Sequence, residues 1–348
     1  METTIAWLSA ETPGIDGGGG RRRQFHQVRV LLERGIDVHA ATLEGPQDDA
    51  SLRALCPVAR FRPGRLRPGR ELARFLRDLR PERAVVSHVE SLPHVSSALG
   101  DIPFLLDFHN VSSRWHAAHG EELEAERWRQ GEQEALRAAA AATACSAEEA
   151  AALGGGVEVA GHGVAPAEWP ESALAAEREP AAALFGSWEH EPNAAAGRWL
   201  AAEIWPAVRA EMPHARLLLA GPGAPPAALL ALPGVEHLGR ADSLAGLLGR
   251  VRVALVPIRG GIGARVKFGE ALASGAAVVS TTEGAEGFDA AGAFARADGA
   301  EAFARACVEL LGDEERARAL GAAGRRLALE RLTWERTTEP IVRFAVGQ

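Results

Sequence analysis

The sequence predicts an α/β protein of two doubly wound domains, each a parallel sheet wrapped by helices. Two observations carry this prediction. Short apolar runs alternate with amphipathic helical segments, and the alternation starts afresh near residue 181 after a stretch rich in proline, alanine and glutamate. Strands that alternate with helices form parallel sheets through right-handed crossovers. Ligands bind such sheets beyond the carboxyl ends of the strands, so the loops there are expected to carry function.

The first series has a glycine-rich loop between its first strand and its first helix. We expect strands at residues 4–8, 36–43, 84–87, 103–108 and 143–146, and helices at 22–34 and 121–142. Gly35 is the expected C-terminal cap of the first helix, and Ser146 is the expected N-terminal cap of the helix after the last strand. Segments 11–20, 87–93 and 112–120 are expected to be loops that set specificity.

The second series follows a predicted linker at residues 166–180. Strands are expected at 181–186, 215–220, 235–238, 253–257 and 276–281, and helices at 194–211, 244–250 and 264–274. The predicted domains are therefore residues 1–165 and 181–330, followed by a helical segment at 331–348.

The composition is that of an ordinary globular protein. Hydrophobic residues make up 47% of the 348-residue chain, and the net charge of −8 argues against nucleic-acid binding, which requires a basic surface. Three cysteines stand far apart without metal-ligand spacing and are interpreted as reduced thiols. Since no signal peptide and no apolar run of bilayer length is evident, a cytoplasmic location is expected.

Lysine, asparagine and tyrosine are almost missing from the chain. Lys267 is the only lysine, Asn110 and Asn193 are the only asparagines, and tyrosine is absent. Heavy use of alanine, glycine, arginine and proline indicates the coding bias of a GC-rich bacterial genome. Under that bias a lysine or asparagine that persists is a candidate for a chemical role, and drift is the alternative. All three residues lie at strand ends or helix starts.

The segment 253–275 has the composition of a phosphate site. A buried strand runs into a loop with Gly260, Gly261 and Gly263 and then into a helix, whose first amides and positive end suit an anion. Arg265 and Lys267 add cations where the helix dipole disfavours them by about 0.3–1 kcal/mol, so an anion is expected there. The alternative is a loop–helix junction with solvated charges.

The residue one turn further on suggests a nucleoside. Glu270 shares a helix face with Lys267, and its carboxylate is suited to accept hydrogen bonds from ribose hydroxyls. The loop fits neither the P-loop nor the dinucleotide pattern. The run 17–20 also fails the dinucleotide spacing, because Arg22 and Arg23 stand where the last glycine belongs.

At residues 263–281 and 284–287 the chain resembles the donor-binding region of GT-B glycosyltransferases of the family 4 type. Residues 185–193 and 218–223 are similar to the start of that family's C-terminal domain, and 108–110 and 332–335 also fit. The resemblance covers nearly the whole chain. It implies a GT-B fold of two facing Rossmann-like domains, with a C-terminal helix that returns to the N-terminal domain.

The resemblance also implies roles for individual residues. Arg265 and Lys267 would hold the donor diphosphate as catalytic groups, and Glu270 would bind the ribose. His109 would contact the transferred sugar or the acceptor as a third catalytic group. The remaining donor-binding residues would be Gly18, Gly19, Gly186, Gly263, Gly284, Ala285 and Glu286. On the acceptor side, Asn110 would fix the local loop next to Arg114, whereas His26, His88 and His94 are expected to be structural or surface residues.

Two positions depart from the family pattern. Ile262 stands where the family often has a glutamate that touches the donor sugar, and His162 replaces the asparagine of an Asn-Gly-Val motif. The family implies retention of anomeric configuration. We expect no metal and no cofactor beyond a nucleotide-sugar co-substrate, because cations and a helix end can stabilise the leaving diphosphate, whose oxygen takes the acceptor proton.

The acceptor is left open as a small molecule, a glycan or a lipid. In the arginine-rich segment 60–83, one apolar stripe comprises Leu72, Phe75, Leu76 and Leu79. We interpret it as an ordinary amphipathic helix packed on the first sheet, in preference to a membrane-surface helix.

Three other functions are alternatives to glycosyl transfer. A GT-B nucleotide-sugar epimerase or hydrolase would keep the diphosphate site, and so would a degenerate nucleotide-sugar or partner-binding protein. A nicotinamide oxidoreductase would need a dinucleotide fingerprint that the sequence lacks.

Overall fold

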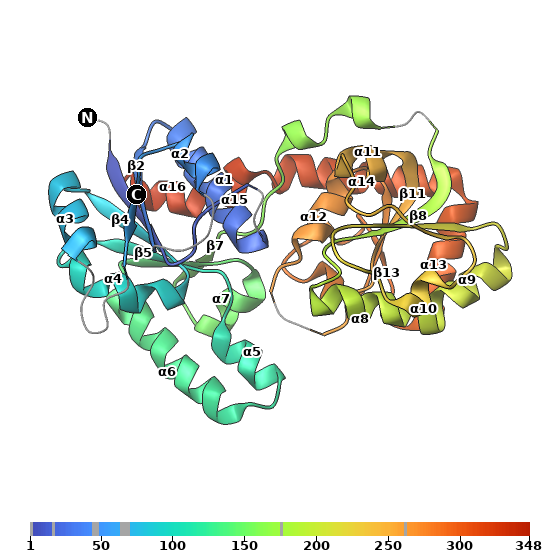
Figure 1. Cartoon of the computed structure of the whole chain (residues 1–348), viewed down its shortest axis with the longest axis horizontal. Helices are drawn as coiled ribbons and strands as arrows, with labels where there is room; N and C mark the ends of the chain where they lie inside the picture. Colours follow the sequence, from blue (N-terminus) through green and yellow to red (C-terminus); the bar gives the residue numbers. More distant parts are fainter. Residues whose placement is uncertain (1–2, 16–17, 44–48, 63–69, 175–176, 261–262) are drawn as a thin grey trace. The chain divides into compact units, whose positions relative to one another are not determined.

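The computed structural model describes residues 3–15, 18–43, 49–62, 70–174, 177–260 and 263–348 (Figure 1). The chain forms two compact units. Unit 1 comprises Met1–Gly163 with Trp334–Gln348, and unit 2 comprises Val164–Thr333. Each unit contains one parallel sheet with helices packed on it, as the alternating sequence pattern predicted. The α/β prediction is confirmed.

Unit 1 is built on a seven-stranded sheet in the order β3-β2-β1-β4-β5-β6-β7. The strands are β1 Thr4–Ser9, β2 Asp37–Leu43, β3 Val58–Phe61, β4 Arg83–Ser87, β5 Phe104–Phe108, β6 Ala141–Ala144 and β7 Val157–Val159. Because the order reverses between β1 and β4, the loops after these strands flank a crevice suited to a ligand.

The helices of unit 1 cover this sheet. They are α1 Gly19–Glu33, α2 Ala50–Arg53, α3 Arg70–Leu79, α4 Leu92–Leu99, α5 Ser112–Ala118, α6 Glu122–Ala138 and α7 Ala147–Leu153, and a 3-10 turn η1, Val89–Ser91, precedes α4. Leu72 and Leu76 of α3 are buried in the core, so the interpretation of this helix as an ordinary packed one is confirmed. The predicted caps are also confirmed, since Gly35 has φ +76° and Ser146 Oγ accepts from the Glu149 amide at 3.1 Å.

The last helices, α15 Trp334–Thr337 and α16 Glu339–Ala345, belong to unit 1. The indole of Trp334 is buried and stacks on the imidazole of His26 with ring centroids 4.7 Å apart. A Cβ on Gly163 would lie 2.7 Å from that indole, so the chain can pass there only as glycine. The predicted return of the C-terminal helix to the first domain is confirmed.

Unit 2 has a six-stranded sheet in the order β10-β9-β8-β11-β12-β13. The strands are β8 Glu179–Phe185, β9 Arg216–Ala220, β10 Val235–His237, β11 Val251–Val256, β12 Ala277–Ser280 and β13 Ala295–Arg296. The helices are α8 Glu191–Trp199, α9 Trp205–Glu211, α10 Ala227–Leu230, α11 Leu244–Arg250, α12 Val266–Ala273, α13 Ala300–Gly312 and α14 Glu314–Arg331. Residues 166–174 form two 3-10 turns within unit 2, and Trp169 there is buried.

Three predicted elements differ from the structure. The helix predicted at 121–142 ends at Ala138, because Ala142 and Ala144 are buried in strand β6; packing beside β5 outweighs the helix propensity of alanine. Segment 112–120, predicted as a loop, contains α5. The helix predicted at 194–211 passes through a π-helical stretch, Leu200–Ile204, next to Pro206, whose nitrogen cannot donate to the preceding turn.

In the described part of the chain, no helix combines the length and the apolar character needed to cross a membrane.

Candidate functional site

The loops after β8 and β11 meet where the strand order of the second sheet reverses. After β11 the chain passes Gly260 and Gly263, which have φ of +76° and +96°, and enters α12 with Arg265 as the N-terminal cap. The Arg265 guanidinium donates to the Gly260 carbonyl at 3.2 Å. The carboxylate of Glu283 accepts from the Gly260 amide. These two contacts hold the start of the glycine loop; Gly261 and Ile262 lie outside the described residues.

Lys267 is the centre of this loop cluster. Its Nζ donates to the Phe185 carbonyl at 2.9 Å and to Oδ1 of Asn193. Burial lowers the pKa of the Lys267 ammonium to about 7, with Glu270 opposing and Arg265 adding to the shift. The only lysine and one of the only two asparagines therefore contact each other, joining the starts of α8 and α12.

The predicted donor residue Gly186 directly follows β8 and has φ +130°. A Cβ there would lie 2.8 Å from Nδ2 of Asn193 and 3.0 Å from Nζ of Lys267. Asn193 Nδ2 donates to the Ser187 carbonyl at 2.7 Å, which fixes its oxygen toward the lysine. Only glycine at position 186 leaves room for this pair.

The other predicted donor residues lie on either side of this pair. Gly263 is buried at the end of the glycine loop, and Glu270 is half-buried one turn after Lys267 on α12. The turn after β12 holds Gly284, where a Cβ would lie 2.5 Å from the Val256 carbonyl. Its amide donates to Thr281 Oγ1 at 2.9 Å, and the amides of Ala285 and Glu286 donate to carbonyls in the same turn.

In unit 1 a buried ion pair organises the ends of β5 and β6. Asp107 accepts two hydrogen bonds from Arg23 at 2.6 and 2.8 Å and one from Thr143 Oγ1 at 2.7 Å. Both charged side chains are fully buried. Burial alone would raise the pKa of Asp107, but Arg23 and His109 hold it well below its usual range. The arginine that breaks the dinucleotide spacing thus has a structural role that the sequence pattern did not reveal.

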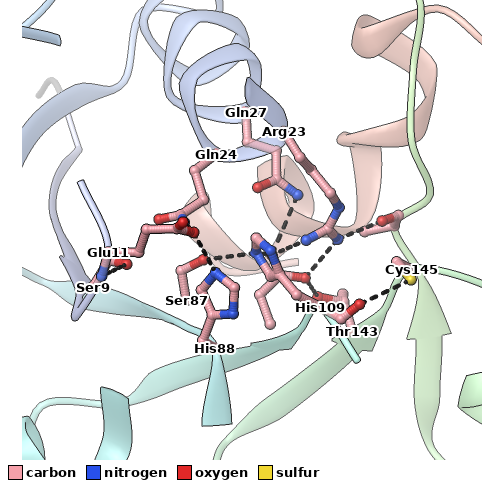
Figure 2. Close-up of polar contacts among 12 residues, drawn as sticks. Ser9, Glu11, Arg23, Gln24, Gln27, Ser87, His88, His109, Thr143 and Cys145 are labelled. Atoms are coloured by element: carbon pink, nitrogen blue, oxygen red, sulfur yellow. Dashed lines mark hydrogen bonds and ion pairs between the residues drawn. The ribbon is translucent and has the colours of Figure 1, made fainter. Parts of the chain in front are cut away.

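His109 lies beside this ion pair (Figure 2). Its Nε2 is 2.9 Å from Ser87 Oγ and 3.3 Å from Oδ2 of Asp107. Its Nδ1 is buried and has no hydrogen-bond partner among the described residues. Burial, His88 and Arg23 set the pKa of His109 well below 6.5, so the imidazole is neutral at pH 7. One ring nitrogen is fixed by the protein, and the other is buried without a partner in the described part of the chain.

Glu11 and His88 complete this cluster. The rings of His88 and His109 are 3.6 Å apart, and Nε2 of His88 is 3.2 Å from Oε2 of Glu11 (Figure 2). His88 has φ +68°, a strained conformation for a non-glycine residue. It had been expected to be structural or on the surface. The sequence signals for this pair were the carboxylate of Glu11, in the glycine loop, and the histidine at position 88, directly after β4.

The glycine run of unit 1 begins helix α1. Gly18 is the N-terminal cap and Gly19 the first helical residue. A Cβ on Gly20 would lie 3.2 Å from Nδ1 of His109 and 3.3 Å from Glu11 Oε2. The glycines therefore let the positive end of α1 approach the histidine cluster, where the first-turn amides of a helix suit a polar ligand.

The predicted acceptor-side residues next to His109 are more exposed. Asn110 is exposed between β5 and α5, and Arg114 is half-buried on α5, where its charge acts on the pKa of Glu149. His162, the other departure from the family pattern, is half-buried, and desolvation of its ring lowers its pKa to about 3. Among the described residues, no group of three or more His, Cys, Asp or Glu side chains is arranged to hold a metal ion.

Two doubly wound units and a C-terminal helix that returns to unit 1 define the GT-B fold. A sequence model described as Glycosyltransferase Family 4 matches residues 17–165, and one described as Glycosyl transferases group 1 matches residues 179–313. The chain belongs to this family.

Solved structures of GT-B glycosyltransferases share the fold. Sucrose-phosphate synthase from Thermosynechococcus elongatus superposes with TM-score 0.73 at 18% identity, over 99% of each chain. Anabaena HepE, in complex with UDP and glucose, gives 0.72 at 13% over 100% of each. WaaG, a glycosyltransferase involved in lipopolysaccharide biosynthesis, gives 0.65 at 12% over 99% of this chain and 100% of WaaG. A search of curated protein sequences found no significant match.

Proposed function

We propose that this glycosyltransferase moves a sugar from a nucleotide-diphosphate donor to a hydroxyl-bearing or other nucleophilic acceptor, with retention and without a metal. The observation that carries the proposal is Lys267. Lys267 lies in the first turn of α12, close to the N-terminal cap Arg265, and its ammonium donates hydrogen bonds to two neutral oxygens. A half-buried cation whose direct partners are neutral is suited to gain an anionic partner.

The donor diphosphate would lie at the start of α12. Negative charge grows on it as the glycosidic bond breaks, so Arg265, Lys267 and the helix end would bind the transition state more tightly than the ground state. The departing phosphate oxygen would take the acceptor proton on the same face of the sugar. Glu270 would accept from the ribose hydroxyls, and these cations would do the work that a metal does in other transferases.

His109 would act as a neutral hydrogen-bonding group. Its low pKa excludes a general-acid role at pH 7, and its free Nδ1 is suited to a sugar or acceptor hydroxyl. Ser87 and Asp107 would fix its ring, and Gly18 and Gly19 would bring the end of α1 to the same ligand.

A thermal-shift panel of nucleoside diphosphates and nucleotide sugars tests the donor site. A ligand at about 100 times its Kd stabilises the folded protein by about 2.7 kcal/mol. We expect one nucleotide series to raise the Tm of the wild type but not that of Lys267→Ala. Arg198→Ala, which removes an exposed cation from α8, is the matched control and should respond like the wild type.

Absence of any shift at millimolar ligand would contradict donor binding. Product analysis with the stabilising nucleotide sugar then separates transfer from the alternatives. Release of free sugar in the presence of every acceptor would indicate a hydrolase, and an altered donor would indicate an epimerase.

A further inference from the structure

A cavity of about 500 Å³ lies in unit 1 between η1–α4 and α6. Small-molecule sites commonly measure roughly 300–1,000 Å³. Its apolar wall comprises Val89, Leu92, Pro93 and Trp128. The cavity wall adjoins the histidine cluster in the sequence, since Val89 directly follows His88. The turn η1, which contains Val89, packs against β4 and β5.

The charged side chains that line the cavity are acidic. Glu90 and Glu134 line it, and no lysine or arginine does so within the described residues. Glu90 Oε1 accepts from Ser112 Oγ at 3.3 Å, which ties the cavity to the start of α5 just after His109 and Asn110. Two carboxylates beside an apolar wall favour a neutral or cationic ligand and disfavour an anionic one.

Gly131 forms part of the cavity wall in the middle of α6. Glycine weakens a helix interior, and the remainder of this helix is rich in alanine, glutamate and arginine. Gly131 is exposed, and no described atom lies within 4 Å of a Cβ built on it. A larger side chain at this position would therefore enter the cavity without meeting a neighbour.

We propose that this cavity binds the acceptor, as a small molecule with an aromatic or alkyl part and a neutral or cationic polar group. The inference rests on the glycosyl transfer proposed above. Val89, Leu92, Pro93 and Trp128 hold the apolar part, Gly131 keeps the space open, and Glu90 and Glu134 exclude anionic acceptors.

Three phenols of equal size test this assignment by ligand-observed NMR. Tyramine is cationic, tyrosol is neutral and 4-hydroxyphenylacetate is anionic. We expect tyramine and tyrosol to bind the wild type, and the anion to bind at least about tenfold more weakly. Gly131→Leu, which fills the cavity, should weaken tyramine binding by at least about tenfold, without lowering Tm because leucine favours a helix over glycine.

The control is Gln130→Leu, which adds the same side chain one residue earlier, at an exposed site outside the cavity. It should bind tyramine like the wild type. The assignment is wrong if Gly131→Leu binds tyramine within about twofold of the wild type, or if no phenol binds at about 10 mM. If nucleotides shift the Tm but no phenol binds, the assignment of the cavity is wrong and the proposed donor site stands. Phenol binding without any nucleotide shift would overturn glycosyl transfer and leave a cavity for another ligand.

Discussion

The two units differ in the partners that they give to a cation near the start of a helix. In unit 1, Arg23 forms a two-pronged ion pair with Asp107, and both groups are fully buried. In unit 2, the direct partners of the Lys267 ammonium are a backbone carbonyl and an amide oxygen. The first charge is neutralised by the fold, and the pKa of Asp107 falls. The second is held in place without being neutralised, and the pKa of the lysine itself falls to about 7. A charge that the fold has already neutralised depends on its partner, and one without a directly bound counter-charge can still bind an anionic ligand.

The largest expected effect is on the stability of unit 1. Asp107→Asn would leave the Arg23 guanidinium buried without a counter-charge, which we expect to cost about 3–5 kcal/mol. Chemical denaturation of the whole protein measures this loss in the free energy of unfolding. Asp78→Asn removes a carboxylate from an exposed pair with Arg74 and should change stability by less than about 1 kcal/mol. Equal effects of the two substitutions would show that burial does not distinguish these ion pairs.

The second prediction concerns the pH dependence of donor binding. The pKa of Lys267 is lowered to about 7, so its positive charge is complete below that pH and is lost as pH rises through it. Since the charged form would bind the diphosphate, affinity for a nucleotide sugar should fall by about tenfold between pH 6 and pH 8. Titration calorimetry at both pH values, with a nucleotide sugar whose phosphates do not ionise in this range, measures it. A flat profile would argue that the lysine is not the titrating group.

A third prediction concerns a carboxylate in direct contact with Lys267. Asn193→Asp places a carboxylate beside Nζ of Lys267, which raises the pKa of the lysine and neutralises its charge. Nucleotide-sugar affinity at pH 6 should fall by about 3- to 10-fold, and the fall between pH 6 and pH 8 should disappear. Asn193→Ser is the control, since it weakens the hydrogen bond from Lys267 without adding charge. This variant should keep the pH dependence of nucleotide-sugar affinity. If both variants keep it, Asn193 does not control the state of the lysine.

The smallest expected effect is on His109. His88→Asn removes the imidazole beside His109. The backbone of residue 88, with φ 68° and ψ 133°, is as strained for asparagine as for histidine, so stability should change by less than about 1 kcal/mol. Burial and the neighbouring His88 are the two largest causes of the low pKa of His109, so its pKa should rise in the variant. NMR titration of the histidine ring protons measures the change. An unchanged titration of His109 would mean that burial alone sets its protonation.

Sequence reasoning located the fold and the positions of most strands, since buried parallel strands are continuous apolar runs. It missed β3, β7 and β13, and it extended the helix of α6 into the first residues of β6, where tertiary packing outweighs the propensity of alanine. Lys267 and Asn193 were singled out by their rarity, but that rarity gave no sign that they contact each other. Glu11 and His88 were missed as a pair, because residues 77 positions apart are joined only by the pairing of β1 with β4.

By itself, the sequence determined the α/β class, the family and the glycine loop before α12, because periodicity, rare residues and short motifs are local properties of the chain. Tertiary structure decided which charges are neutralised. Arg23 and Lys267 are both cations near the starts of helices that follow glycine loops, and nothing in their local sequence separates them. The difference arises because β5 brings a carboxylate to one and β8 brings a carbonyl to the other. In a buried setting the nearest partner, rather than the residue type, fixes the charge balance.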